Sequence, residues 1–287
     1  MTLRKALLSS LLLSFAIAGN VYAETAEEKF DRAYQYTEQQ NYQAAFPIFK
    51  ELAEQGNVSA QYNLGLMYDS GQGVSQDYHQ AFKWYQKAAE QGDVKAQYNL
   101  GNMYRQGLGV RQDYHQAFKW YQKAAEQGVA NSQYNLGHMY RQGLGVTQDY
   151  HQAVKWYQKA AEQGHANAQF SLGLMYNNGQ GIAQDYYQAV KWFQKAAEQG
   201  VVNAQYNLGF SYYNGQGINQ DYRQAAKWFH KAAEQGLVDA QYNLGVMYSK
   251  GQGVKQDKSK AKYYYSLACD NGDQKGCNHY HQLNEGK

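Results

Sequence analysis

Hydrophobic residues recur along most of the chain with the spacing of amphipathic helices, and the arrangement repeats every 36 residues. In the second period, one apolar stripe consists of Ala96, Leu100, Met103 and Tyr104. After a glycine-containing stretch, another stripe consists of Ala117, Trp120, Tyr121, Ala124 and Ala125. Each period is therefore predicted to hold two helices, and neither helix can bury its stripe alone.

The periods are near-identical copies of one unit. Residues 76–92 read QDYHQAFKWYQKAAEQG, and residues 112–128 read the same. The repeated tryptophans are Trp84, Trp120, Trp156, Trp192 and Trp228, with Tyr264 in the sixth place. Six units cover residues 57–272, and self-similarity at such a period is the signature of a stacked repeat array.

Local signals mark where the helices of a unit begin and end. The glycines of Gly107–Val110 favour a tight reversal after the first helix. Asp113 and Gln116 have the spacing of a capping box at the start of the second helix. Gly128 stands where a helix-terminating glycine is expected. Gly101 is predicted to let the two helices of the unit approach closely, because it has no side chain.

The repeats are flanked by less regular segments. Residues 24–56 are predicted to form a degenerate pair, with helices near Ala26–Gln39 and Tyr42–Glu54. Pro47 lies inside the second of these helices and is expected to bend or weaken it. Residues 273–287 are predicted to form a polar helix that covers the end of the array.

The first 23 residues have the features of a secretory signal peptide. Arg4 and Lys5 precede the apolar run Ala6–Gly19, and Val21-Tyr22-Ala23 provides a small-x-small cleavage site. An uncleaved anchor is the alternative, but the run is shorter than the about 20 residues of a typical membrane span. We expect an exported, periplasmic chain beginning at Glu24; the cell surface and the medium are the alternatives.

Charge and motifs give no indication of nucleic-acid binding or catalysis. Without the leader, 25 basic and 24 acidic residues remain, a net charge of +1, with no clustered basic face. The chain has no glycine-rich phosphate loop, nucleophile elbow or metalloprotease helix. His79, His115 and His151 occur once per repeat, too far apart to share a metal ion. We therefore predict no catalytic residue, no cofactor and no metal.

The repeated strings AQYNLGxMYxxGxGV and QDYxQAxKWYxKAAEQG resemble the Sel-1-like repeat family, a branch of the tetratricopeptide-repeat superfamily. The resemblance implies an all-α fold, an α/α solenoid wound as a right-handed superhelix of helix-turn-helix repeats. It also implies that the first helices line a concave groove. The function that it implies is a non-catalytic adaptor or scaffold, which by the predicted export acts in the cell envelope and binds another protein or peptide.

The chain's two cysteines are Cys269, at the end of the last repeat, and Cys277, at the start of the helix that follows, eight positions apart. This arrangement looks like the bridged units of bacterial cysteine-rich Sel-1-like proteins. Two cysteines in an exported chain also favour a disulfide. A zinc site is the alternative, but two thiolates leave a tetrahedral ion half-coordinated.

The first helices present positions that vary between otherwise similar repeats. In the second repeat, Tyr98, Asn102 and Arg105 share a face roughly opposite the core stripe, and by the resemblance this face lines the groove. The slot of Asn102 is continued by His138, Leu174, Phe210 and Val246. The slot of Arg105 is continued by Arg141, Asn177, Tyr213 and Ser249. We predict a partner with acidic groups near the two arginines and an apolar anchor near Phe210; neutral drift on a solvated face is the alternative.

An aromatic row offers a second kind of binding surface. It consists of Tyr62, Tyr98, Tyr134, Phe170, Tyr206 and Tyr242. Such a row could stack on the sugars of a glycan such as peptidoglycan, or it could simply pack within the repeats. A β-lactam-binding or hydrolysing enzyme is a remote further alternative, suggested by cysteine-rich relatives. The chain lacks the serine–lysine arrangement that such chemistry needs.

Overall fold

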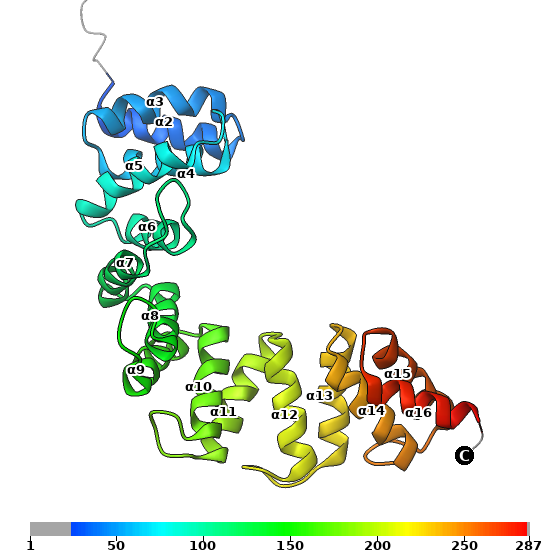
Figure 1. The fold of residues 1–287 in the computed structure, drawn as a ribbon. Coiled ribbons are helices and arrows are strands. Elements are labelled where there is room, and N and C mark those ends of the chain that lie inside the picture. The colour runs from blue at the N-terminus through cyan, green and yellow to red at the C-terminus, as the bar shows by residue number, and fades with distance from the viewer. Residues whose placement is uncertain (1–23, 286–287) are drawn as a thin grey trace, which may run out of the picture. The chain divides into compact units, whose positions relative to one another are not determined.

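The computed structural model describes residues 24–285, and the predicted signal peptide lies outside them. These residues form fifteen α-helices and no strand (Figure 1). The helices are α2 (Ala26–Glu38), α3 (Tyr42–Glu54), α4 (Val58–Ser70), α5 (Tyr78–Glu90), α6 (Val94–Gln106), α7 (Tyr114–Glu126), α8 (Ala130–Gln142), α9 (Tyr150–Glu162), α10 (Ala166–Asn178), α11 (Tyr186–Glu198), α12 (Val202–Asn214), α13 (Tyr222–Glu234), α14 (Val238–Lys250), α15 (Lys258–Asp270) and α16 (Gln274–Asn284). The predicted all-α solenoid of helix pairs is confirmed. None of these helices is long and apolar enough to cross a membrane.

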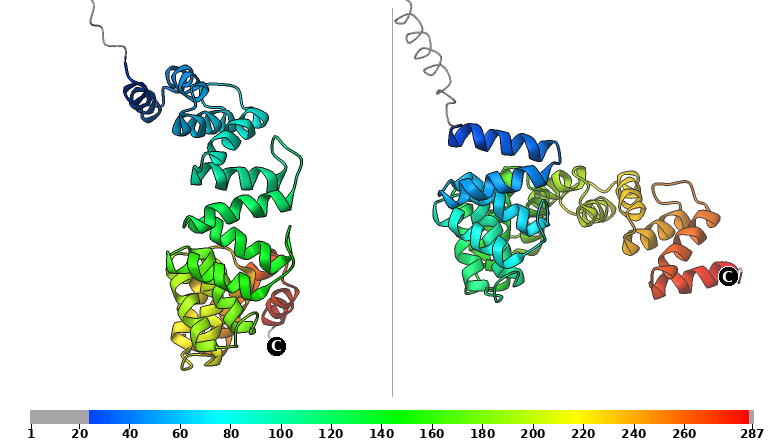
Figure 2. Two further views of the ribbon diagram at one scale, coloured as in Figure 1. Left: turned by 90° about the vertical axis from the view of Figure 1, so that its left-hand side faces the viewer. Right: turned by 90° about the horizontal axis from the view of Figure 1, so that it is seen from above.

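The helices fall into two compact units. One contains the residues up to Ala96 together with Leu108–Val110, and the other contains Gln97–Gly107 and the residues from Arg111 onward. Within the second unit each helix from α7 to α16 packs on its neighbour in the chain (Figures 1 and 2). Consecutive pairs thereby bury the apolar stripes that no single pair could cover.

The predicted helix ends are present, with one correction. Asp113 caps α7, because its side-chain oxygen accepts the backbone N–H of Gln116 at 3.0 Å. The reciprocal half of the capping box is not made. Instead, the backbone N–H of Asp113 donates to the carbonyl of Tyr104 at 2.9 Å, which closes the turn between α6 and α7. At the other end, Gly128 has φ +93°, and its N–H donates to the carbonyl of Ala125, as in a Schellman motif.

Two glycines of each repeat are required by close contacts. A Cβ on Gly101 would lie 2.7 Å from the ring of Tyr121, so the predicted close approach of α6 and α7 is confirmed. The second glycine of the GxG turn has a role beyond the reversal. Gly145 has φ +66°, and a Cβ there would overlap the carbonyl of Tyr114, the first residue of α7 in the preceding repeat. The turn of one repeat therefore rests directly on the backbone of the repeat before it.

Buried glutamines link the repeats through polar contacts. Gln133 is 4% exposed, and its Nε2 donates to the carbonyl of Ala125 in the preceding repeat at 3.1 Å. Its Oε1 accepts from Nε2 of Gln163, the residue that follows α9, at 2.7 Å. The same pair of bonds is made by Gln61, Gln169 and Gln205. Each such amide is satisfied at both ends, which burial of a polar group requires.

The N-terminal residues form the helices α2 and α3. Thr25 and Glu28 form a reciprocal capping box at the start of α2. Helix α3 continues through Pro47 without interruption, and the local weakening expected there stays a prediction. The pair is also held by an ion pair between Lys29 and Glu51.

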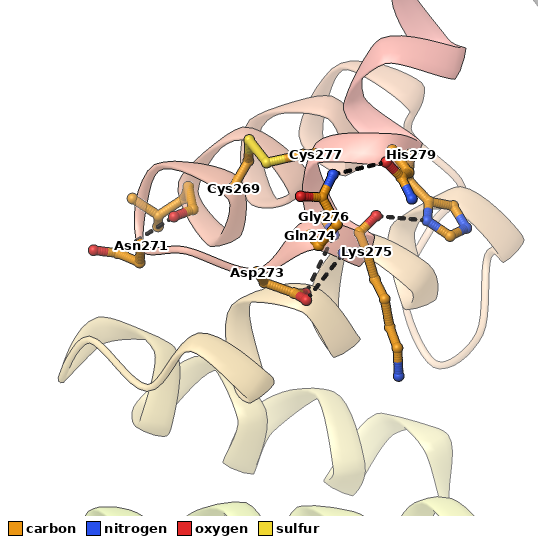
Figure 3. The surroundings of a disulfide bond; sticks show 10 residues. Cys269, Asn271, Asp273, Gln274, Lys275, Gly276, Cys277 and His279 are labelled. Atoms are coloured by element: carbon orange, nitrogen blue, oxygen red, sulfur yellow. Dashed lines mark hydrogen bonds between the residues drawn. A yellow bond between two sulfur atoms is a disulfide. The ribbon is translucent and has the colours of Figure 1, made fainter.

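The predicted disulfide between Cys269 and Cys277 joins the end of α15 to the first turn of α16 (Figure 3). The two Cα atoms are 4.5 Å apart. Asp273 begins α16 by accepting the backbone N–H groups of Lys275 and Gly276. Cys277 follows Gln241 by one repeat length, and Cys269 follows Ala233 likewise. The covalent bond therefore occupies the positions at which a buried glutamine reaches an alanine carbonyl elsewhere in the array.

Removal of this disulfide is expected to loosen the last helix more than the rest of the array. Closing so short a loop should contribute about 2–3 kcal/mol on the chain-entropy estimate. Because each repeat contacts only its neighbours, Cys269→Ser/Cys277→Ser should raise amide exchange in α16 while exchange in α8 and α9 stays unchanged. Equal protection of α16 in both proteins would contradict this expectation.

Candidate partner-binding face

Two adjoining cavities lie on the first helices of consecutive repeats in the second unit. The larger has a volume of about 610 Å³ and lies between α6 and α8, where Arg105, Tyr134 and His138 line it. The smaller has a volume of about 230 Å³ and lies between α8 and α10, where Arg141 and Leu174 line it. Tyr134 and His138 border both cavities. Five of the predicted partner-binding residues are thus brought together.

Arg105 is held at the larger cavity by a buried tyrosine of its own repeat. Its Nε donates to the hydroxyl oxygen of Tyr121 at 3.2 Å. The Tyr121 hydroxyl in turn donates to Oδ1 of Asn102 at 2.7 Å. Burial raises the pKa of Tyr121 to about 12, against the opposing effect of the Arg105 charge. The tyrosine therefore stays protonated at physiological pH and holds the guanidinium in place through one nitrogen only.

Arg141 occupies the equivalent position at the smaller cavity and is less well satisfied. Its Nε is buried and makes no hydrogen bond within residues 24–285. Its charge lies close enough to Tyr157 to oppose the rise of that hydroxyl's pKa, which burial brings to about 12. A buried N–H of a cation without an acceptor is costly. Arg141 therefore lies at the smaller cavity with one guanidinium nitrogen that no described acceptor satisfies.

The cavity walls carry positive charge and no negative charge. Neither cavity is lined by an aspartate or glutamate. Neither arginine forms an ion pair within the described part of the chain, where the ion pairs are Lys29–Glu51 and Arg32–Glu24. The pKa of His138 is lowered, first by burial and then by the charges of Arg141 and Arg105. The site therefore favours a ligand that brings negative charge.

The link between Arg105 and Tyr121 belongs to a pattern along the repeats. In the first repeat, the equivalent Tyr85 hydroxyl donates to Oδ2 of Asp69 at 3.2 Å. In the fourth and fifth repeats, Phe193 and Phe229 replace the tyrosine, and the slot of Arg105 holds Asn177 and Tyr213. A charged residue thus stands at this slot only where a buried hydroxyl is available to it.

The aromatic row packs against the second helices of the repeats. The ring of Tyr98 lies 6.1 Å from that of Tyr121, and the ring of Tyr134 lies 5.8 Å from that of Tyr157. Tyr134 is also stacked on His165 at 4.8 Å. The expectation that this face lies opposite the core is therefore wrong: it borders the core, because buried tyrosines of the second helix reach up to it.

The remaining predicted residues lie away from the two cavities. Phe210 is 43% exposed and stacks on Tyr206 in the fifth repeat. The Tyr213 hydroxyl donates to Oε1 of Gln252 at 3.0 Å, which ties it to the turn of the sixth repeat. Val246 packs on the core cluster around Tyr248 and Tyr265. Of these side chains, Phe210 is the one that offers an exposed apolar surface.

The larger cavity is also lined by Asn135 and Tyr114, which were not predicted as binding residues from the sequence. Asparagine occupies the position of Asn135 in nearly all repeats, so a comparison that selects variable positions does not select it. Tyr114 belongs to the second helix, which the sequence did not associate with the groove. Within residues 24–285, no cluster of three or more His, Cys, Asp and Glu side chains is arranged as a metal site.

Comparison with known proteins identifies relatives of the whole array. The "Sel1 repeat" family matches residues 58–93, 94–129, 130–165, 166–201, 202–237 and 238–273, one residue later than the sequence periods. A comparison with curated proteins returned no match.

Two solved structures are similar to the chain over most of its length. One is c5321, a protective antigen of uropathogenic Escherichia coli strains with an SLR fold: identity is 38% over 91% of this chain, with a TM-score of 0.87. The chain spans 56% of the length of that protein. The other is a Sel1 repeat protein from Oxalobacter formigenes, with 34% identity, coverage of 84% of this chain and 96% of that one, and a TM-score of 0.73. Repeats of this type generally serve as non-catalytic scaffolds that bind proteins or peptides. On six consecutive matches and these structural relatives, the chain belongs to the Sel1 repeat family.

Proposed function

We propose that this protein is an exported adaptor of the cell envelope that binds a partner protein through a peptide segment lying along its first helices. The observation that carries the proposal is the pair of adjoining cavities with Arg105, His138 and Arg141 on their walls and no carboxylate. Arginine guanidinium groups bind carboxylates through paired, charge-assisted hydrogen bonds. An acidic stretch of the partner would supply the acceptors that the site lacks.

The apolar end of the proposed binding face is Phe210. Because an exposed aromatic ring contributes large contact area on binding, such residues often act as anchors at interfaces. Phe210 lies on α12, two repeats after Arg141, so a partner that reaches both must extend along the array. Export is supported by the leader-like residues 1–23 and by the disulfide, which is typical of oxidising compartments.

The proposal is tested by replacing Phe210 with a photo-crosslinking residue in the mature protein and identifying what it captures in its native compartment. One dominant protein adduct is expected. The matched control carries the same residue at Tyr187, which is 61% exposed on the second helix α11. Capture of the same proteins at both positions, or of none at Phe210, would contradict the proposal. Loss of the adduct upon addition of soluble cell-wall fragments would favour a glycan ligand instead.

A further inference from the structure

The two cavities share one wall, and His138 stands in it. The wall is a single turn of α8 in which Tyr134 and His138 border both cavities. Arg105 approaches from α6 on one side, and Arg141 lies on α8 at the other cavity. An anionic chain that occupied both cavities would therefore lie against His138.

His138 makes no hydrogen bond within residues 24–285, so its ring nitrogens are available to a ligand. The charged groups that face it are Arg105 and Arg141. The titratable residues that line the cavities beside it are Tyr134 on α8 and Tyr114 at the start of α7, and His165 at the start of α10 is stacked on Tyr134. The part of α10 that lines the smaller cavity contributes amides, a serine hydroxyl and apolar side chains. No carboxylate of these walls can stabilise a protonated imidazole.

We propose that His138 joins the two cavities into one pH-responsive binding site for an acidic peptide segment, which carries one carboxylate to Arg105 and another to Arg141. This inference rests on the proposed function and adds the ligand's chemistry and its regulation. In the empty site, burial of the His138 ring and then the charges of Arg141 and Arg105 disfavour its protonation. A bound segment neutralises those cations and supplies acceptors, so protonation becomes favourable in the complex.

The direction of the pH effect follows from linkage. The pKa of His138 lies below its ordinary value of 6.5 in the free protein and rises when carboxylates bind. The complex then takes up a proton, and affinity increases as the pH falls through the range between those two values. Each unit by which binding raises the pKa corresponds to at most about a tenfold gain in affinity. Glutamate side chains remain largely ionised down to about pH 5, so the ligand does not lose its own charge first.

The test measures fluorescence anisotropy of a labelled peptide of alternating glutamate and alanine, between pH 7.5 and 5.5. The mature protein is expected to bind about fivefold or more tightly at the lower pH. The counterpart peptide with glutamine in place of glutamate should not bind at either pH. In His138→Asn the pH dependence should disappear while binding at pH 7.5 persists, because Asn102 already occupies this slot in the second repeat. The control variant His151→Asn, changed at an exposed position on the second helix α9, should retain the full pH dependence.

The inference is overturned if His138→Asn keeps the pH dependence, or if the glutamine peptide binds as well as the glutamate peptide. These results are distinguishable from a failure of the proposed function. A specific adduct at Phe210 with no binding of the acidic peptide would leave the adaptor role standing and remove this site. Conversely, pH-dependent binding of the acidic peptide without an adduct at Phe210 would keep the site and remove the extended groove.

Discussion

Replacing both arginines by aspartate, Arg105→Asp/Arg141→Asp, is expected to lower affinity for the partner by about 100-fold or more. Each substitution removes a charge-assisted hydrogen-bond donor, and loss of one member of a desolvated charge pair costs about 2–5 kcal/mol. It also places a carboxylate where the partner's own acidic group must lie. The measurement is the dissociation constant of the partner captured at Phe210, determined with wild-type and variant protein.

This double variant is expected to fold, because the first repeat already carries the arrangement that it creates. There the Tyr85 hydroxyl donates to Asp69, so the Tyr121 and Tyr157 hydroxyls can donate to the new aspartates in the same way. The control is Lys155→Glu/Arg223→Glu, which changes the net charge equally on exposed positions of second helices. If the control weakens binding as much as the arginine variant, long-range electrostatics and not the cavities would be responsible.

A large loss of stability is expected for Gly145→Ala. An L-residue at φ +66° costs about 1–2 kcal/mol, and the added Cβ would overlap the backbone carbonyl of Tyr114. Overpacking against a backbone that cannot move aside adds about 1–3 kcal/mol. We expect a total loss of about 3 kcal/mol in the free energy of unfolding, seen as a lower urea midpoint and faster amide exchange in α7 and α8.

Gly164→Ala provides the matched control within the same repeat. Gly164 also has positive φ, +89°, but a Cβ there would meet nothing within 4 Å. Its substitution should carry only the conformational cost of about 1–2 kcal/mol. Equal losses for the two variants would show that the contact between the turn and the preceding repeat contributes nothing to stability.

The helices could be predicted because their limits are set by local chemistry. Asp113 accepts one N–H of the first turn of its own helix, and Gly128 adopts a backbone conformation that other residues resist. Both effects act within a few residues, so they are visible in the sequence. The reciprocal bond of the capping box was not predictable in the same way. Its place is taken by the carbonyl of Tyr104, which the tight turn brings back from the preceding helix.

Contacts between repeats were not predictable from local signals. The local sequence indicates a turn at Gly145, but no neighbouring residue in the sequence indicates that Tyr114 lies against it. Gln133 is a polar residue beside an apolar stripe, and its two hydrogen bonds reach residues eight and thirty positions away. The burial of Gln133 becomes apparent only from the way neighbouring helices pack together.

The candidate site was predictable in part. Helical spacing placed Arg105, His138 and Arg141 on one side of the first helices, where the cavities lie. The sequence did not show that buried hydroxyls of the second helices hold the charged residues at this slot. A signal was present, because phenylalanine replaces the tyrosine in the fourth and fifth repeats, which lack a charged residue at this slot. It becomes interpretable only once the ring is known to point toward the slot.

The glutamine links have a consequence for how such a chain can change in length. A junction built from Gln133, Ala125 and Gln163 has the same chemistry as one built from the corresponding residues of another internal repeat. Unequal exchange between near-identical repeats can therefore insert or delete one whole copy and still join compatible surfaces. The junction closed by Cys269 and Cys277 is not interchangeable, since an internal repeat offers no thiol to either cysteine. We therefore expect gains and losses of copies to occur among the internal repeats and to leave the closing repeat in place.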